Sequence, residues 1–281
     1  LPEVRTGFYP SLQRSFEQAA ALTQNQVLVC CTENKVDMQG NTILQLIDKH
    51  VAGVALVPAT VPPTPAYQVR QLQQHGIPVV FCHRDVEGIQ APLLSIPFRE
   101  VGLLAGQTLL EQGHRSIALF SPHRATASIE YETGLRAALA DSADSCPEPF
   151  IFHGPSSQLH PIDYEADLLN TLETMFQRPD PPTAIFATFD SLAELIYLLL
   201  GKLGKRVPED VSLLGFGGTV RHGAIQSRLS SITVDEVAIG RKAAELLTQM
   251  KQGELPIDSA EVFPMPINTS AGQTLGPPPA Q

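Results

Sequence analysis

Side chains suited to binding a small molecule follow four short apolar runs of this 281-residue sequence. The runs end at Cys82, Phe120, Thr188 and Phe216, and the next residues are His83–Arg84, Ser121–His123, Phe189–Asp190 and Gly217–Gly218. If the runs are parallel strands, their carboxyl ends meet at one edge of a sheet, where α/β proteins bind ligands. We therefore expect a binding site that includes His83, Arg84, Ser121, Phe189, Asp190 and Gly217.

Sequence patterns typical of catalytic, metal and nucleotide sites are missing. There is no nucleophile elbow, no phosphate-binding Gly-x-x-x-x-Gly-Lys loop and no His-Glu-x-x-His pair. Gly215–Gly218 lacks the spacing of a dinucleotide-binding loop and the helix that would follow it. His153 and His160 flank a loop and are better explained as solvated side chains than as metal ligands. We expect neither an enzyme nor a bound metal or cofactor.

Several of the candidate residues have a structural explanation beside the functional one. Asp190 stands where it could cap the helix that follows it. Arg84 could form a surface salt bridge instead of holding a ligand, and with His83 and Asp85 it is better explained as a strand-end cluster than as an acid–base set. Phe8 and Tyr9, at the start of the first predicted helix, could belong to the core or line the site.

The composition excludes several classes of protein. The formal net charge is −10, and so acidic a surface would repel a phosphate backbone, which makes this chain a poor nucleic-acid binder by itself. No apolar run approaches the length of about 18–20 residues that a membrane span needs. The four cysteines fit neither a zinc site nor a Cys-x-x-Cys motif. Without a signal-peptide pattern, they indicate reduced thiols and a cytoplasmic location.

Apolar runs alternate with helical patterns along the whole chain, which predicts an α/β fold with parallel sheets. The predicted strands are Val27–Cys31, Val54–Val57, Pro78–Cys82, Ala91–Ile96, Ser116–Phe120, Phe150–Phe152, Ala184–Thr188, Val211–Phe216, Ile232–Val234 and Ala260–Ile267. The predicted helices are Tyr9–Leu22, Met38–His50, Tyr67–His75, Arg99–Gln112, Ser128–Leu139, Tyr164–Phe176, Val237–Gln252 and one that begins at Asp190 and ends at Gly204.

The stretch Ala184–Gly218 also carries a family resemblance. Its apolar strand, Asp190, helix, Val-Pro-Glu-Asp-Val-Ser at Val207–Ser212 and Gly215–Phe216 resemble the effector domain of lactose-repressor/galactose-repressor (LacI/GalR) regulators. Further similar stretches are Val51–Pro58, Gly76–Arg84, Gly106–Ala118 and Leu229–Leu247. The resemblance implies two Rossmann-like subdomains with parallel sheets joined by three crossovers, the periplasmic-binding-protein-like type I fold.

That fold would divide the chain into 1–96 plus 234–265 and 97–233 plus 266–270, with a flexible tail at 271–281. Family members begin with a strand and, before it, a helix-turn-helix reader of DNA. Leu1–Thr6 is too short and too polar for both, so we expect both to be absent from this chain.

The resemblance implies a function as well. The chain would be the effector-sensing and dimerisation domain of a homodimeric transcriptional regulator, in which a small ligand in the cleft between the subdomains alters affinity for operator DNA. The alternatives are a solute-binding protein of a transporter and, less favoured, an enzyme on the same fold.

Three ligand-facing positions depart from the family pattern. The family often has Arg, Asn and Asp where this sequence has Tyr131, Phe189 and Gly217. Because each unpaired sugar hydroxyl costs about 1–3 kcal/mol, an ordinary hexose would lose much of its binding energy here. We therefore expect either a sugar-like effector or a flatter, less polar one that stacks on Phe8, Tyr9, Tyr131 and Phe189.

Overall fold

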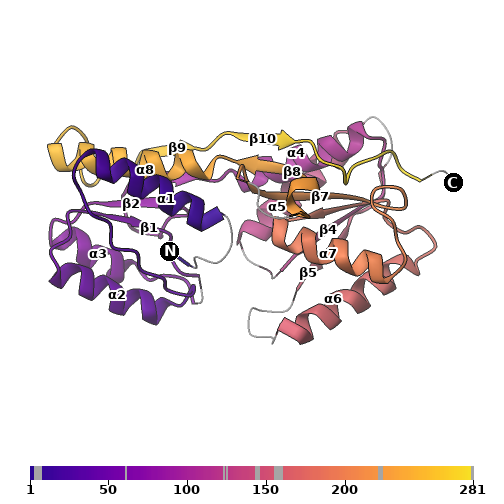
Figure 1. Cartoon of the computed structure of the whole chain (residues 1–281), viewed down its shortest axis with the longest axis horizontal. Coiled ribbons are helices and arrows are strands. Elements are labelled where there is room, and N and C mark those ends of the chain that lie inside the picture. Colours follow the sequence, from indigo (N-terminus) through magenta and orange to yellow (C-terminus); the bar gives the residue numbers. More distant parts are fainter. Residues whose placement is uncertain are drawn as a thin grey trace. The chain divides into compact units, whose positions relative to one another are not determined.

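The computed structural model describes residues 1–2, 8–60, 62–122, 124, 126–142, 146–154, 161–220 and 224–279. The chain forms two compact units (Figure 1). Unit 1 consists of Leu1–Ile96, Gly218–Val220 and Val234–Pro266. Unit 2 consists of Pro97–Gly217, Arg221–Thr233 and Ile267–Gln281.

Unit 1 is built on a four-stranded sheet in the order β1-β2-β3-β9, in which all neighbours are parallel. The strands are β1 (Val54–Leu56), β2 (Val79–His83), β3 (Leu93–Ser95) and β9 (Val262–Pro264). Helices α2 (Val36–Asp48) and α3 (Ala66–Gln74) cover one face, and their Ile43, Val69 and Leu72 pack on Val79 and Phe81. Helix α8 (Glu236–Gln252) covers the other face, with α1 (Phe8–Leu22) packed against it (Figure 1).

Unit 2 contains a six-stranded sheet in the order β10-β8-β7-β6-β4-β5. The strands are β4 (Ile117–Ser121), β5 (Phe150–His153), β6 (Ala184–Ala187), β7 (Ser212–Gly218), β8 (Ser230–Val234) and β10 (Ile267–Ser270). The helices are α4 (Phe98–Glu111), α5 (Thr126–Ala140), α6 (Pro161–Phe176) and α7 (Asp190–Lys202), with a short 3₁₀ turn at Gln226–Arg228. Strands β5, β4, β6 and β7 run parallel, so the predicted α/β fold with parallel sheets is confirmed.

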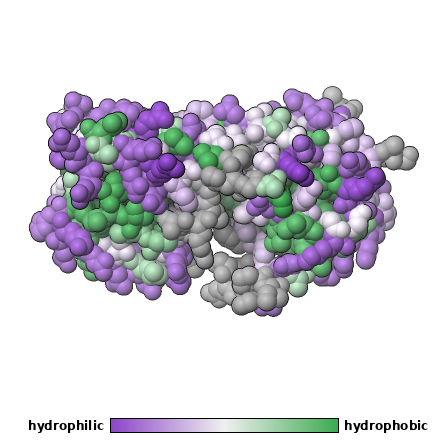
Figure 2. Space-filling model, viewed as in Figure 1, coloured by the Kyte–Doolittle hydropathy of each residue, from purple (hydrophilic) through white to green (hydrophobic). Residues whose placement is uncertain are grey.

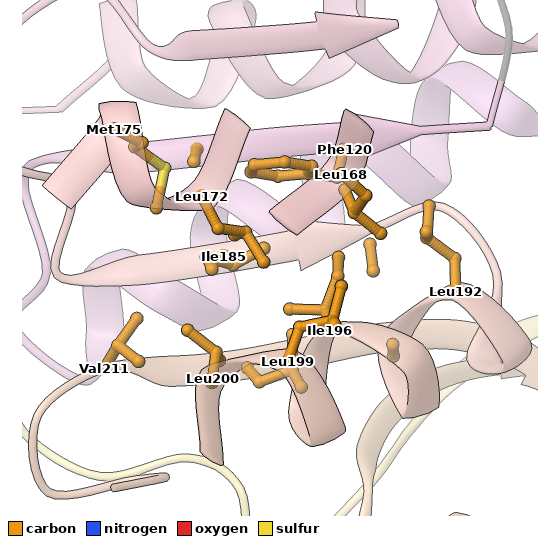
Figure 3. Packing of buried hydrophobic residues seen from close by; sticks show 14 of the residues in the cluster. Phe120, Leu168, Leu172, Met175, Ile185, Leu192, Ile196, Leu199, Leu200 and Val211 are labelled. Atoms are coloured by element: carbon orange, nitrogen blue, oxygen red, sulfur yellow. The ribbon is translucent and has the colours of Figure 1, made fainter. Parts of the chain in front are cut away.

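The core of unit 2 explains why the stretch from β6 to β7 folds as it does. Helix α7 buries Leu192, Ile196, Leu199 and Leu200, which recur at helical spacing, and leaves Leu198 half exposed. Figure 3 shows these side chains, together with Leu168, Leu172 and Met175 of α6, packed on Phe120 and Ile185 of the sheet. Each buried side chain of this size contributes about 1.5–3 kcal/mol, so the amphipathic pattern is sufficient to fix α7 on β6.

The predicted strand Val27–Cys31 belongs to no sheet, which corrects the sequence-based expectation. Its Leu28 and Val29 are 57% and 42% exposed. An apolar cavity of about 250 Å³ is lined by residues 25–30 on one side and 51–56, which include the outer strand β1, on the other. An apolar run becomes a strand only when a neighbouring strand pairs with it, and here none of the described residues fills that place. Figure 2 shows apolar side chains gathered over unit 1, on the left of the view.

Leu1 makes a pair of backbone contacts with this segment that is typical of a parallel bridge. Its amino group donates to the carbonyl of Cys30 and its carbonyl accepts from the N–H of Thr32, both at 2.9 Å. In a parallel ladder, a residue placed before Leu1 would continue along residues 27–30, toward the cavity.

The expectation that 271–281 form a flexible tail is wrong for residues 271–279, which the structure describes. Thr274 is buried, and its hydroxyl donates to the carbonyl of Leu213 at 2.6 Å. The carbonyl of Gly276 accepts from the Ser212 hydroxyl and lies 2.9 Å from Nε2 of the buried His114. These contacts come from residues more than 60 positions away, which local composition could not reveal.

The last predicted strand, Ala260–Ile267, is divided between the two units. Residues Val262–Pro264 form β9 in unit 1 and Ile267–Ser270 form β10 in unit 2. Pro264 and Pro266 have no backbone N–H, so they interrupt any continuous ladder at this point.

We predict that a strand supplied ahead of Leu1 stabilises unit 1. An extension of five β-branched apolar residues is expected to pair with β1 and residues 27–30, cover Leu28 and Val29, and raise the melting temperature by several degrees. The measurement is thermal unfolding together with hydrogen exchange at the amides of β1. An extension of five Gly and Ser residues is the control, and equal melting temperatures for the two extensions would contradict the prediction.

Candidate functional site

The carboxyl edge of the unit 1 sheet brings together three of the predicted site residues. His83 ends β2, and Phe8 and Tyr9 begin α1. The Phe8 and Tyr9 rings meet edge to face with centroids 5.2 Å apart, and the His83 ring lies 6.1 and 6.3 Å from them. The Tyr9 hydroxyl is 3.2 Å from Nδ1 of His83. These half-buried rings form one aromatic cluster.

His83 has an unusual backbone conformation and an imidazole with a lowered pKa. Its backbone φ is +81°, a conformation that bulky residues rarely adopt and that is concentrated at functional sites. Burial, helped by the adjacent Arg84 charge, lowers the pKa of its imidazole to about 3. His83 is therefore a neutral hydrogen-bonding group throughout the physiological range.

Arg84 follows β2 and is held by neutral acceptors. Its Nε donates to the carbonyl of Pro58 at 2.7 Å and its Nη2 to Oδ1 of Asn34 at 3.3 Å. Within the part of the chain that the structure describes, no carboxylate pairs with it, so the surface salt bridge considered above is not what holds it. Burial lowers the pKa of this guanidinium.

Sequence reasoning missed Asn34. Its amide donates to the Thr60 hydroxyl at 2.7 Å and its Oδ1 accepts from the Thr60 N–H at 3.0 Å, which fixes the acceptor that Arg84 uses. The available signal was its place three residues after the predicted strand Val27–Cys31, because loops at that end of parallel strands share one edge.

In unit 2, Asp190 is not the cap of α7 that its position suggested. The N-cap residue is Phe189, which makes no side-chain cap bond, and Asp190 is the first residue of the helix. Its buried carboxylate accepts from the Ser231 hydroxyl at 2.7 Å. A Cβ added at Gly215 or Gly217 would overlap that carboxylate, so these glycines make room for Asp190.

A second buried carboxylate, Glu236, was not predicted. It is fully buried at the start of α8 and accepts from the Thr219 N–H at 2.7 Å, the Thr219 hydroxyl at 3.1 Å and the Val220 N–H at 3.0 Å. A Cβ at Gly218 would overlap it. The signal was the acidic pair that opens α8, in which Asp235 caps the helix by accepting from the Ala238 N–H.

Two of the expected ligand contacts lie in the core of unit 2. Tyr131 is 1% exposed and packs on Phe98, Phe186 and Phe216 with ring centroids 5.2–6.0 Å apart. Its ring offers no free face, which corrects the expectation that it stacks on a ligand. Ser121 is buried as well, at the end of β4.

Thr188 and Phe189, which directly follow β6, offer groups that a ligand could contact. Phe189 is 39% exposed, so its ring can be reached from solvent. The buried Thr188 hydroxyl, also missed by sequence reasoning, has no hydrogen-bond partner among the described residues. An unsatisfied buried hydroxyl beside an exposed ring is a candidate contact for a polar ligand group.

The histidines that sequence analysis considered as metal ligands are placed only in part. Among the described residues, no group of three or more His, Cys, Asp or Glu side chains could hold an ion. His153 lies 3.1 Å from Oε2 of Glu132, while His160 and His123 fall outside the described residues. None of the described helices is long and apolar enough to cross a membrane.

The sequence matches the family described as the periplasmic binding protein-like domain over residues 107–275, more than half of the chain. Catabolite control protein A of Priestia megaterium is 24% identical over 268 residues, which are 93% of this chain and 76% of that protein. The HTH-type transcriptional repressor PurR of Vibrio atlanticus is 26% identical over 254 residues, 89% of this chain and 72% of that protein.

Solved structures share the fold. A LacI transcriptional regulator from a Rhodococcus species has a TM-score of 0.80 at 19% identity, with 97% of this chain and 96% of that chain covered. A LacI family regulator from Enterococcus faecium with bound ribose has a TM-score of 0.75 at 21% identity, with 98% and 97% covered. The chain therefore belongs to the family of periplasmic-binding-protein-like domains, in the form that LacI/GalR transcriptional regulators carry.

The Asp190 carboxylate occupies the space that a side chain at residue 217 would need, so a substitution there is expected to destabilise the fold. Gly217→Ala is expected to lower the free energy of unfolding by about 1–3 kcal/mol, because the new methyl group must displace the Asp190 carboxylate from Ser231. Gly201→Ala in α7, where a Cβ meets nothing within 4 Å, is expected to stabilise by about 0.5–1 kcal/mol. Urea unfolding measures both, and a Gly217→Ala variant as stable as the parent would contradict this packing.

The neutral state of His83 predicts a dependence of stability on pH. As the pH falls from about 6.5 toward about 3, the unfolded chain binds a proton that folded His83 does not, so stability is complete above this window and is lost within it. His83→Asn, which tolerates the positive φ, is expected to remove up to about 1.4 kcal/mol of this loss per pH unit. Urea unfolding at pH 7.5, 6 and 5 tests it, and parallel profiles for the parent and the variant would refute it.

Proposed function

We propose that this chain is the effector-sensing and dimerisation part of a transcriptional regulator that binds operator DNA. The observation that carries the proposal is its family, since the similar curated proteins include repressors and regulators over about three quarters of their length. The carboxyl edges of both sheets add support, because they hold half-buried and buried polar groups rather than a catalytic set. Phe8, Tyr9, His83, Arg84, Phe189 and Asp190 are the proposed sensing residues.

The proposed mechanism is a shift between conformations. The chain passes between its units at several points, among them the step from Gly217 in unit 2 to Gly218 in unit 1. A ligand that binds one arrangement of the units better than another changes their populations. The DNA itself would be read by a helix-turn-helix segment outside this chain, because a chain with net charge −10 repels phosphate.

The remaining expectations are part of the same proposal. The regulator works as a homodimer in the cytoplasm, since symmetric operators are read by symmetric pairs. It is not an enzyme and needs no cofactor. Its effector is sugar-like or flatter and less polar, and one neighbour in structure holds ribose.

The test uses the full-length protein. DNA fragments that it retains are selected from the source genome, and their affinity is measured by fluorescence anisotropy with and without a panel of sugars, nucleosides and aromatic metabolites. We expect one compound to raise the melting temperature and to change DNA affinity by about 5–150-fold. Sedimentation should give a dimer. A protein that retains no DNA fragment, or whose affinity no compound alters, would count against the proposal.

Phe189 gives a residue-level check of the same proposal. Phe189→Ala is expected to weaken binding of the active compound by about fivefold or more, because an exposed ring that stacks on a ligand contributes about 0.5–1.5 kcal/mol beyond its buried area. Leu198→Ala, a half-exposed apolar position on the body of α7, is the control. Isothermal titration calorimetry measures both, and equal affinities would remove Phe189 from the site.

A further inference from the structure

Arg84 is a positive charge without a negative partner in the described part of unit 1. Its two hydrogen bonds go to a backbone carbonyl and an amide oxygen, both uncharged. A guanidinium has five N–H donors, so most of its donors are left for another acceptor. Partly burying a charge costs free energy that a neutral acceptor repays only in part. Among the described residues, the charge of Arg84 therefore has no opposite charge beside it to balance it.

We infer that Arg84 binds an anionic group of the effector, a carboxylate or a phosphate, at the carboxyl edge of the unit 1 sheet. The inference rests on the proposed sensing function and adds the chemical class of the ligand. A carboxylate or phosphate accepts two parallel N–H bonds from a guanidinium, which is the geometry that Arg recognises best.

The guanidinium is held in place before any ligand arrives. Pro58 and Asn34 fix two of its nitrogens, and Asn34 is itself fixed by two hydrogen bonds to Thr60. A preorganised charge loses little side-chain entropy when it binds, which favours recognition over a purely structural surface contact. The nearest acidic neighbour of Asn34 in the sequence, Glu33, is paired with Lys35 at 3.1 Å and is not engaged with Arg84.

The aromatic cluster next to Arg84 indicates what the anionic group is attached to. His83, directly before Arg84, forms this cluster with Phe8 and Tyr9, and its imidazole is neutral, so it adds no second positive charge. Rings favour a planar or ring-shaped carbon skeleton through stacking and apolar contact. The expected ligand is a small organic anion with a ring, rather than a neutral hexose or a free inorganic ion.

Matched pairs of compounds test the inference on the full-length protein. Each pair has one skeleton with and without the charge: D-galacturonate and D-galactose, D-ribose 5-phosphate and D-ribose, benzoate and benzyl alcohol. Inorganic phosphate is added alone. Calorimetry and thermal shift are measured for the parent, Arg84→Gln, Arg84→Lys and the control Arg70→Gln. Arg70 is an exposed arginine of the same unit that donates to the carbonyl of Gly88.

We expect the charged member of at least one pair to bind about tenfold or more tightly than its neutral partner. Arg84→Gln should abolish this preference, Arg84→Lys should keep part of it, and Arg70→Gln should leave it unchanged. Circular dichroism shows whether each variant is folded, and the preference of the parent is informative even where a variant is not. The carboxylate and phosphate pairs distinguish the two kinds of anion.

Two results overturn the inference. In the first, a neutral compound binds as tightly as its charged partner and alters DNA affinity, so the proposed function stands and only the anionic class is wrong. In the second, Arg84→Gln keeps the preference of the parent. If no member of any pair binds and DNA affinity never changes, the inference and the proposed function fail together.

Discussion

Parallel pairing of the strands is the constraint on which the rest of this structure depends. Because the neighbouring strands of unit 1, and β5, β4, β6 and β7 of unit 2, run in the same direction, the residues that follow them collect at one edge of each sheet. Polar groups at such an edge lie against buried strands and must find partners there. Asp190 finds Ser231, Glu236 finds Thr219 and Val220, and His83 finds Tyr9. Arg84 finds the carbonyl of Pro58 and the amide oxygen of Asn34, which are neutral acceptors, and no carboxylate among the described residues pairs with it.

The two glycines that end β7 change how the departures from the family pattern are understood. From the sequence, Gly217 is a lost acidic contact. In the structure, Gly217 and Gly218 each leave space that a carboxylate from another element fills, Asp190 from α7 and Glu236 from α8. Acidic side chains are therefore still present beside this strand end, buried and bonded to protein groups. Sequence comparison at one position could not show this, because the compensating residues lie 27 positions before and 18 positions after the glycines they contact.

Residue pattern predicted the elements well where the pattern itself decides the structure. The apolar spacing of α7 and the runs that became β4, β6 and β7 follow from burial alone, and the fold class follows from their alternation. It failed where a distant partner decides. Val27–Cys31 has strand composition, but no strand of the described residues lies beside it. Thr274 and Gly276 are held by Leu213, Ser212 and His114, and Tyr131 packs on three phenylalanines. The site could be placed at the strand ends in the same way, but which side chains are free there depends on contacts that spacing does not encode.

The peptide link from Gly217 to Gly218 is one of the places where the chain passes from one unit to the other, and it therefore bears on the proposed shift between conformations. Gly217 belongs to unit 2 and packs on Asp190 of that unit, and Gly218 belongs to unit 1 and packs on Glu236 of that unit. The chain thus changes unit between two residues that have no side chains, with a fixed carboxylate on each side of the change. Rotation about the bonds of these glycines leaves the Asp190–Ser231 bond within unit 2 and the three bonds to Glu236 within unit 1. Each of these four hydrogen bonds joins residues of a single unit, so the shift between conformations proposed above need not break them.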